Sequence, residues 1–191
     1  FRRLLHILLL SPFMVPGVII VIAFIQIYGE SGMLTKLIQA LFGMQKLPYR
    51  FGNLGGIIVV HAYTQYVYFY LNVSIALKYM DYASIEAARG LGASKLHIFK
   101  TVVLPFILPA LLSSAIVTFI SGIASFSAPN LIGGRYKVLS TQIMISKSNN
   151  YLNLASMQVV ILMMMGIAVM FLIRHFELKY SQEASVRSVT I

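Results

Sequence analysis

The sequence has 191 residues, of which 59% are hydrophobic and only 10% are charged, and its mean hydropathy is +0.84. A soluble domain carries about 25% charged residues, so this composition excludes an ordinary soluble protein and indicates an integral membrane protein. The absence of cysteine excludes disulfides and thiolate metal sites. We interpret the formal charge of +10 as topology signals in membrane loops rather than as a nucleic-acid site.

Four segments are long and apolar enough to cross about 30 Å of hydrocarbon as helices. They run from about Leu4 to Tyr28, Leu54 to Leu77, Phe106 to Phe126 and Leu154 to Ile173. Pro12 and Pro16 lie inside the first segment, where they either kink the helix for packing or form a bend that lines a pathway. The sequence therefore predicts an all-α integral membrane protein, a bundle of about four transmembrane helices.

Two connections between these segments contain local signals. Met33 to Phe42 is expected to form a short amphipathic helix on the membrane surface. Ser127 to Asn153 is predicted as a loop, because Pro129 and Gly133-Gly134 are turn signals.

The basic residues favour one orientation of the four spans. One side has nine Lys and Arg residues and the other has six. The first group is Arg2, Arg3, Lys78, Arg89, Lys95, Lys100, Arg174, Lys179 and Arg187; the second is Lys36, Lys46, Arg50, Arg135, Lys137 and Lys147. Because basic residues gather in cytoplasmic loops, both termini and the connection between the second and third spans are predicted to be cytoplasmic.

That central connection is polar and punctuated by glycine. Asp81 is a good N-cap for a helix that Gly92 ends in the left-handed conformation. A second short helix is expected from Ser94 to Val103, after which Leu104-Pro105 returns the chain to the membrane. The sequence thus predicts two short helices that protrude from the bilayer.

The order of residues in this connection is Glu-Ala-Ala, three residues, Gly, nine residues, an aliphatic residue, one residue, and Leu-Pro. It resembles the cytoplasmic signature of permease subunits in binding-protein-dependent ABC importers, with the type I importer fold. The match lies at Glu86, Ala87, Ala88, Gly92, Val102, Leu104 and Pro105, with Val102 where the family more often has Ile. The stretch from Ser125 to Ile143 resembles the subgroup of ferric iron, polyamine and thiamine permeases.

The resemblance implies a coupling helix that inserts into a cleft on a cytoplasmic ATP-binding subunit. The residues implied to couple this chain to the ATPase are Glu86, Ala87, Ala88, Gly92, Leu104 and Pro105. ATP and Mg would then bind to the partner subunit, because the chain has no Gly-rich phosphate loop, and no enzyme activity or cofactor is expected in this chain. The other implied partners are an external substrate-binding protein, a second permease subunit or domain, and membrane lipid.

Polar residues also form stripes inside two predicted spans. His61, Gln65, Tyr68 and Asn72 lie on one face of the second span, and Ser114, Thr118, Ser121 and Ser125 on one face of the third. The stripe of the second span is expected to line the permeation path or the contact between two permeases, and the serine stripe either packs between helices or faces water. The expected substrate-path residues are His61, Gln65, Tyr68, Asn72, Ser121 and Ser125.

Together these features predict a multi-pass permease in a bacterial inner membrane that passes a small substrate by alternating access. Ferric iron is the first substrate expected, and polyamine or thiamine the alternatives. An ion-coupled secondary transporter is a further alternative, although such proteins need carboxylates at membrane depth and the five acidic residues here lie in loops or the tail. Residues 1–180 are expected to form the importer domain without its first span or spans, with the coupling loop at 80–105 and a polar tail at 181–191.

Overall fold

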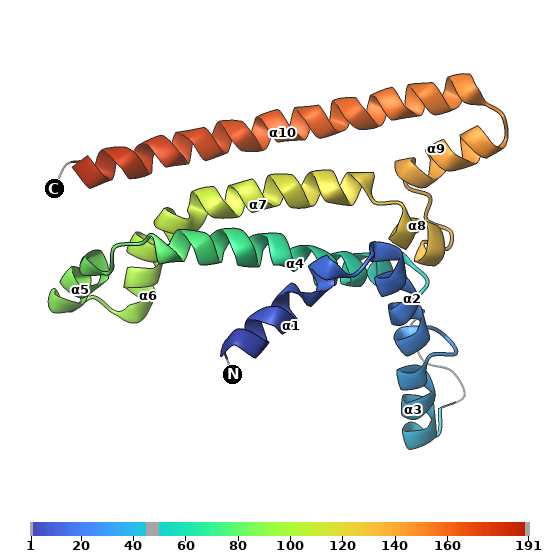
Figure 1. Cartoon of the computed structure of the whole chain (residues 1–191), viewed down its shortest axis with the longest axis horizontal. Helices are drawn as coiled ribbons and strands as arrows, with labels where there is room; N and C mark the ends of the chain where they lie inside the picture. Colours follow the sequence, from blue (N-terminus) through green and yellow to red (C-terminus); the bar gives the residue numbers. More distant parts are fainter. Residues whose placement is uncertain (1, 45–49, 190–191) are drawn as a thin grey trace. The chain divides into compact units, whose positions relative to one another are not determined.

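A computed structural model of the chain describes residues 2–44 and 50–189, and the side chains of residues 4–44 and 50–178. The regular structure in this part of the chain is helical throughout (Figure 1), which confirms the predicted all-α fold. The helices are α1 (Arg2–Met14), α2 (Gly17–Tyr28), α3 (Met33–Phe42), α4 (Leu54–Lys78), α5 (Tyr82–Gly90), α6 (Lys95–Ile98), the π-helix η1 (Phe99–Val103), α7 (Leu104–Ala124), α8 (Ser127–Ile132), α9 (Leu139–Ser148) and α10 (Leu152–Val189).

By length and composition, three segments of the described chain are apolar enough to cross a membrane: Gly17–Phe42, in which a turn separates α2 from α3, Lys95–Ala124 and Leu152–Leu178. The 25 residues of α4 correspond to a helix about 37 Å long, which also suffices to cross the hydrocarbon core. Helix α4 is not among those three segments, because it carries polar side chains such as His61, Gln65 and Asn72. The chain is therefore an integral membrane protein with three to four membrane-length helical segments.

The first predicted span is divided into two helices, so the prediction of one helix from Leu4 to Tyr28 is wrong. Pro12 lies inside α1, whereas Pro16 precedes α2 with φ −53° and ψ 133°, which is extended backbone. Pro16 has no N–H to donate to the carbonyl group of Pro12, so the helical ladder cannot continue through it. The second proline therefore separates two helices instead of bending one. The predicted helix from Met33 to Phe42 is confirmed as α3.

The predicted loop from Ser127 to Asn153 contains two short helices, α8 and α9, so this prediction also needs correction. Pro129 lies in the first turn of α8, where its missing N–H costs no helical hydrogen bond. Gly134 follows with φ +56°, and a Cβ atom there would lie 2.9 Å from the carbonyl oxygen of Gly52. The turn signals were thus real, but they mark the ends of helices rather than an irregular segment.

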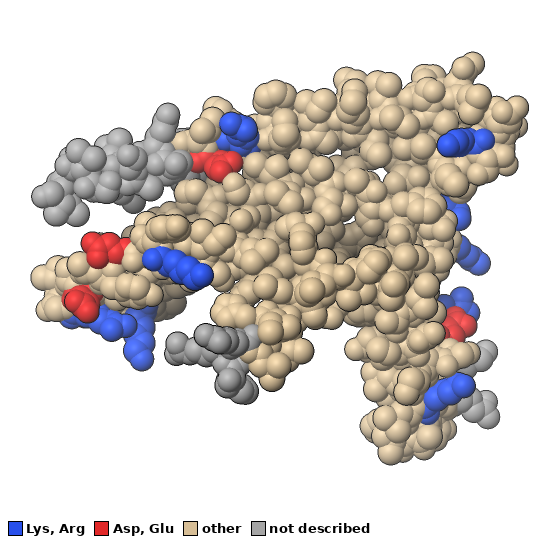
Figure 2. All heavy atoms as spheres, viewed as in Figure 1, with Lys and Arg blue, Asp and Glu red and all other residues tan. Residues whose placement is uncertain are grey.

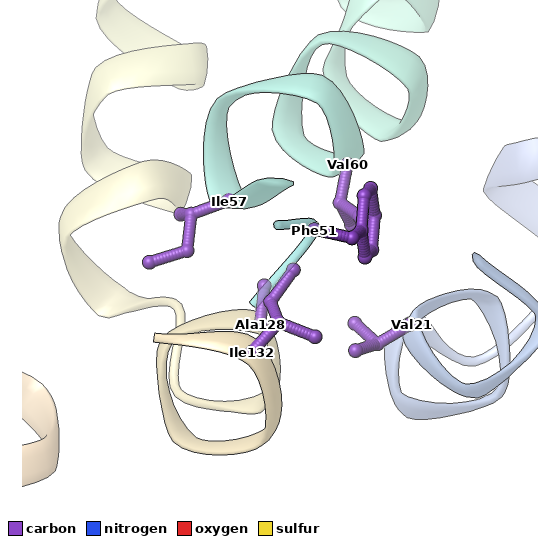
Figure 3. Packing of buried hydrophobic residues seen from close by; sticks show 6 residues of the cluster. All are labelled: Val21, Phe51, Ile57, Val60, Ala128 and Ile132. Atoms are coloured by element: carbon purple, nitrogen blue, oxygen red, sulfur yellow. The ribbon is translucent and has the colours of Figure 1, made fainter. Parts of the chain in front are cut away.

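The chain divides into two compact units, residues 1–67 with 121–164 and residues 68–120 with 165–191. In the first unit α2 packs against α8, and both contribute to a small apolar core (Figure 3). Its buried members are Val21, Phe51, Ile57, Val60, Ala128 and Ile132. The side chains of Phe24, Ile25 and Tyr28 pack against this cluster and extend the core along α2.

Polar contacts tie together the helices of the second unit. The Asn72 amide on α4 donates to the Ser114 hydroxyl on α7 over 3.0 Å. The Ser113 hydroxyl, also on α7, donates to a carboxylate oxygen of Glu177 on α10 over 2.7 Å. Glu177 was expected in the polar tail, but it lies on α10 within the membrane-length segment Leu152–Leu178, so that expectation is corrected. Such bonds matter in a membrane protein because lipid offers these groups no other partner. This unit also carries α5, α6 and the connection that resembles the permease signature.

Candidate functional site in the loop between α4 and α7

The loop begins with a capped helix. The Asp81 carboxylate accepts a hydrogen bond of 2.9 Å from the backbone N–H of Ala83, which satisfies one of the free donors at the start of α5. Asp81 was predicted as this N-cap, and the prediction is confirmed. The cap fixes the point at which the chain leaves α4 and turns into α5 (Figure 1).

The end of α5 is a Schellman motif centred on Gly92. The N–H of Ala93 donates to the carbonyl of Ala88 over 3.1 Å, and the N–H of Gly92 donates to the carbonyl of Arg89 over 2.9 Å. Gly92 has φ +80°, the left-handed conformation that this motif requires and that glycine adopts at low cost. The predicted C-cap role of Gly92 is confirmed, and it gives the turn between α5 and α6 a defined geometry.

The second helix of the loop differs from the prediction, because it does not end before the membrane. The Ser94 hydroxyl caps α6 by accepting from the N–H of His97, and the chain then passes through η1 directly into α7. In η1 the N–H of Leu104 donates to the carbonyl of Phe99, five residues back. The next residue, Pro105, has no N–H, so the widened turn adjoins a position where the α-helical ladder is interrupted in any case. The helical segment Lys95–Ala124 is therefore continuous from the loop into the membrane-length part of α7.

The surface of the loop is exposed and carries charges of both signs. In the view of Figure 2, acidic and basic side chains gather at this loop, on a surface that is otherwise mostly uncharged. The exposed charged residues of the loop are Asp81, Glu86, Arg89, Lys95 and Lys100. Leu91, at the turn between the two helices, is 90% exposed.

An open hollow of about 490 Å³ lies between α5 and α6 on this surface. It is lined by Ala88, Leu91, Gly92, Ala93, Ser94, His97 and Thr101. The Thr101 hydroxyl donates to the carbonyl of His97 over 2.7 Å, so it is held on the helix. The lining is small and partly apolar, which suits a protruding side chain of a partner.

The six residues expected to contact an ATPase lie in two parts of the structure, four on α5 and its C-terminal turn and two at the start of α7. Glu86 and Ala87 are exposed on α5, Ala88 is half-buried, and Gly92 forms the exposed turn. Leu104 and Pro105 are half-buried at the start of α7. The first four thus form a surface, whereas the last two belong to the helix that the loop enters. Leu91, Ser94 and His97 were not among the predicted site residues, although Ser94 was expected to begin the second helix and is an N-cap signal.

Two of the six expected substrate-path residues, His61 and Asn72, make polar contacts with other helical residues. Nδ1 of His61 lies 3.0 Å from the carbonyl oxygen of Ile57 in the preceding turn of its own helix. Asn72 bonds to Ser114, a buried residue that also donates to the carbonyl of Ala110 over 2.7 Å. These contacts stabilise helices or join them.

Gln65 is the member of this set with an unused polar atom. It is only 8% exposed, and among the described residues its Oε1 has no hydrogen-bond partner. A Cβ atom at Gly122 would lie 3.6 Å from its Nε2, so the glycine leaves room beside the amide. Ser121 is half-buried on α7, and Ser125 lies after the end of α7, where its carbonyl accepts from the Ser140 hydroxyl over 2.7 Å.

The fold and the loop together define the class of protein. It is a helical membrane protein with a solvent-exposed helical loop between two membrane-length helices. The family described as "Binding-protein-dependent transport system inner membrane component" matches residues 1–182. The chain belongs to this family, and the resemblance noted in the sequence is confirmed.

Curated relatives are similar over most of this chain. A probable ABC transporter permease protein y4fN of Sinorhizobium fredii is 32% identical over 193 residues, which are 99% of this chain and 33% of that protein. The ferric transport system permease protein FbpB of Actinobacillus pleuropneumoniae is 27% identical over 76% of this chain and 21% of its own length. The spermidine/putrescine permease PotB of Haemophilus influenzae is 24% identical over 90% of this chain and 62% of its own length. The chain thus spans about a third of y4fN and about a fifth of FbpB.

A solved structure supports the fold. A chain of the MetNI methionine ABC transporter, in a structure of its inward-facing conformations, superposes with a TM-score of 0.67. The superposition covers 94% of this chain and 75% of that chain at 18% sequence identity. At this identity the likeness concerns the fold alone.

Proposed function

We propose that this chain is the membrane-spanning permease part of an ATP-driven importer, and that its α5–α6 loop docks on a separate cytoplasmic ATP-binding subunit. The observation that carries the proposal is the rigid, exposed loop, capped at Asp81 and turned at Gly92, in a chain that matches the permease family over residues 1–182. ATP and Mg would bind to the partner subunit, and this chain would supply the path through the membrane. Residues 1–180 would form the transport domain, 80–105 its coupling segment and 181–191 a polar tail.

The loop offers the partner both charge and shape. The Glu86 carboxylate is exposed and available to a basic group, and Ala87 beside it lets another backbone approach closely. Leu91 projects from the turn, so a hydrophobic pocket on the partner would bury it. Because α6, η1 and α7 are continuous, a displacement of the docked loop would pass directly into α7. Leu104 and Pro105 lie at the point where that transfer takes place.

The docking proposal is tested by co-purification. The full-length protein would be co-expressed with its candidate ATP-binding subunit, as wild type and with Glu86→Lys or Gly92→Asp. We expect each variant to enter the membrane normally and to retain about tenfold less ATP-binding subunit. A tenfold weaker association corresponds to the loss of about 1.4 kcal/mol of binding free energy, which is the size of one good contact.

The control for charge reversal is Glu30→Lys. Glu30 is also an exposed carboxylate, 3.5 Å from Arg50, but it lies in the turn between α2 and α3. An exposed ion pair contributes at most about 1 kcal/mol, so this change should leave co-purification intact. Equal retention of the ATP-binding subunit by wild type and both loop variants would contradict docking through this loop.

For the substrate we propose ferric iron first and polyamines second. The support is the similarity to the ferric permease FbpB and, over a longer part of the chain, to the polyamine permease PotB. Uptake of radiolabelled ferric iron and of spermidine into cells that express the full-length transporter would separate the two. ATP-dependent uptake that survives collapse of the ion gradients supports the importer, whereas loss of uptake with the gradients would favour a secondary transporter.

The remaining parts of the proposal concern the orientation of the chain, its other partners and the substrate path. We place the loop and the C-terminus on the cytoplasmic side of a bacterial inner membrane, because nine of the 15 Lys and Arg residues fall on that side. An external binding protein and a second permease subunit or domain would complete the transporter. The substrate path would follow His61, Gln65, Tyr68, Asn72, Ser121 and Ser125, with Gln65 as the first residue to test because its Oε1 has no partner within the described chain.

A further inference from the structure

Helix α3 has a ridge of exposed apolar side chains that the first unit does not cover. Met33, Leu37 and Leu41 follow one another at intervals of four residues and are 77%, 55% and 70% exposed. Side chains at this spacing lie one above the other on a helix. Lys36 is also exposed, but it lies on the neighbouring face and is the only charged residue of α3.

The direction of this ridge is fixed by a tight joint between α2 and α3. A Cβ atom at Gly29 would lie 2.4 Å from the carbonyl oxygen of Ile25, and one at Gly32 would lie 2.4 Å from that of Ile27. Only glycine fits at either position without a shift of the backbone. The buried Thr35 hydroxyl donates to the carbonyl of Tyr28 over 3.3 Å and holds α3 against the end of α2.

Helix α2, which precedes α3, also exposes apolar side chains. Val21 anchors α2 in the apolar core, while Val18, Ile19 and Ile22 on the same helix are exposed. The whole segment Gly17–Phe42 is apolar enough to lie within a membrane. In the view of Figure 2 the surface over α3 is mostly uncharged, with basic atoms along one edge. An apolar ridge bordered by a lysine is the pattern of a helix that lies in the plane of the membrane interface.

We propose that α3 lies in the interfacial layer of the lipid bilayer, with Met33, Leu37 and Leu41 among the upper acyl chains and Lys36 directed towards water. The occupant of the ridge is lipid rather than protein, because α3 belongs to the segment Gly17–Phe42, whose composition is apolar enough for a membrane. A single cation contributes little attraction to anionic headgroups compared with three buried apolar side chains. The contact therefore depends on acyl chains and not on headgroup charge.

The chain has no cysteine, so single labelling sites can be introduced directly. In the full-length protein, Leu37→Cys and the matched control Lys36→Cys would each carry an environment-sensitive fluorophore. Both side chains are exposed in the chain itself, so a difference between them reports what surrounds the helix. The protein would be placed in nanodiscs of phosphatidylethanolamine and phosphatidylglycerol that contain a nitroxide lipid labelled near the headgroup.

We expect the nitroxide lipid to quench the label at position 37 roughly threefold more than the label at position 36, and aqueous iodide to show the reverse order. The same pattern is expected in pure phosphatidylcholine. Equal iodide quenching at both positions would place α3 in water and overturn the proposal. If position 37 is protected from both quenchers, another protein surface covers the ridge. If quenching by the nitroxide lipid requires phosphatidylglycerol, headgroup charge dominates the contact. Either result also overturns the proposal. None of these outcomes depends on docking of the α5–α6 loop.

Discussion

The hydroxyl group of Tyr66 on α4 donates a hydrogen bond of 2.7 Å to the carbonyl oxygen of Leu9 on α1. Leu9 lies three residues before Pro12, which is inside α1. Pro12 cannot donate to the carbonyl of Leu8, and the Ser11 hydroxyl donates to that oxygen instead over 2.8 Å. Two hydroxyl groups therefore bond to the neighbouring carbonyls of Leu8 and Leu9, in the turn before Pro12, and the one from Tyr66 joins α1 to α4.

The first prediction concerns this bond. Tyr66→Phe keeps the ring and removes the donor, so α1 should be held less firmly on α4. Interhelical hydrogen bonds in membrane proteins contribute on average about 0.6 kcal/mol, with a maximum near 1.7. For a protein of this size the midpoint of thermal unfolding of the purified protein should fall by about 2 to 4 °C for each kcal/mol lost.

Tyr63→Phe is the control for the loss of a hydroxyl group. The ring of Tyr63 packs against Phe24, with centroids 5.2 Å apart, and within the described residues its hydroxyl makes no hydrogen bond. The unfolding midpoint should therefore stay unchanged. Equal midpoints for both variants would show that the bond from Tyr66 adds no stability.

The second prediction compares two glycines of the α5–α6 loop. Gly92 has φ +80° whereas Gly90 lies in the last turn of α5, and a Cβ atom would meet nothing within 4 Å at either position. Gly92→Ala should therefore strain the turn by about 1 to 2 kcal/mol through its backbone conformation alone. Gly90→Ala should strengthen α5 by up to about 1 kcal/mol. Hydrogen exchange of α5 amides should be faster in Gly92→Ala and slower in Gly90→Ala. Faster exchange in both variants would contradict the conclusion that the positive φ of Gly92 is what requires glycine at that position.

The α5–α6 loop shows which structural features can be predicted well from a few neighbouring residues. The roles of Asp81 and Gly92 were both correct, because a cap and a left-handed turn depend on only a few neighbouring residues. The family signature pointed to the same stretch, and the family match over residues 1–182 agrees with it. The amphipathic pattern likewise predicted the bounds of α3.

The incorrect predictions for the first span and for the end of the second loop helix both concern a proline that cannot donate a helical hydrogen bond. Pro16 ends one helix and Pro105 follows a π-turn without ending the helical segment, although both lack the same N–H group. Whether the helix ends or continues depends on whether another donor or a widened turn can satisfy the carbonyl group that the proline leaves unbonded. The local sequence pattern does not show this. Partners for the polar stripes were also unpredictable, because the bond from Asn72 to Ser114 joins residues 42 positions apart.

The third prediction tests whether Asn72 acts in packing. Ser114 is fully buried and accepts the hydrogen bond of 3.0 Å from the Asn72 amide. Asn72→Ala, Ser114→Ala and the double variant form a cycle whose coupling energy should be about 0.5 to 1.5 kcal/mol, read from unfolding midpoints. If Asn72 only packs, substrate preference should remain that of the wild type. A coupling energy near zero together with altered preference would instead support a place on the substrate path.

The fourth prediction separates structure from transport at Gln65. Its Oε1 is buried without a hydrogen-bond partner in the described part of the chain, and leaving such a group unsatisfied costs about 1 to 3 kcal/mol. Gln65→Met has a similar length and removes the polar group, so the unfolding midpoint should stay equal or rise. If Gln65 contacts substrate or water on the path, uptake should fall in this stable variant.

Gln158→Met is the matched control, because the Oε1 of Gln158 accepts a hydrogen bond of 3.0 Å from Ser146. The same substitution there removes a satisfied acceptor and leaves the Ser146 hydroxyl unpaired, so the unfolding midpoint should fall. An equal fall for Gln65→Met would show that Gln65 has a structural partner in the assembled transporter. Unchanged uptake in a stable Gln65→Met variant would remove Gln65 from the substrate path and leave its burial as a feature of packing.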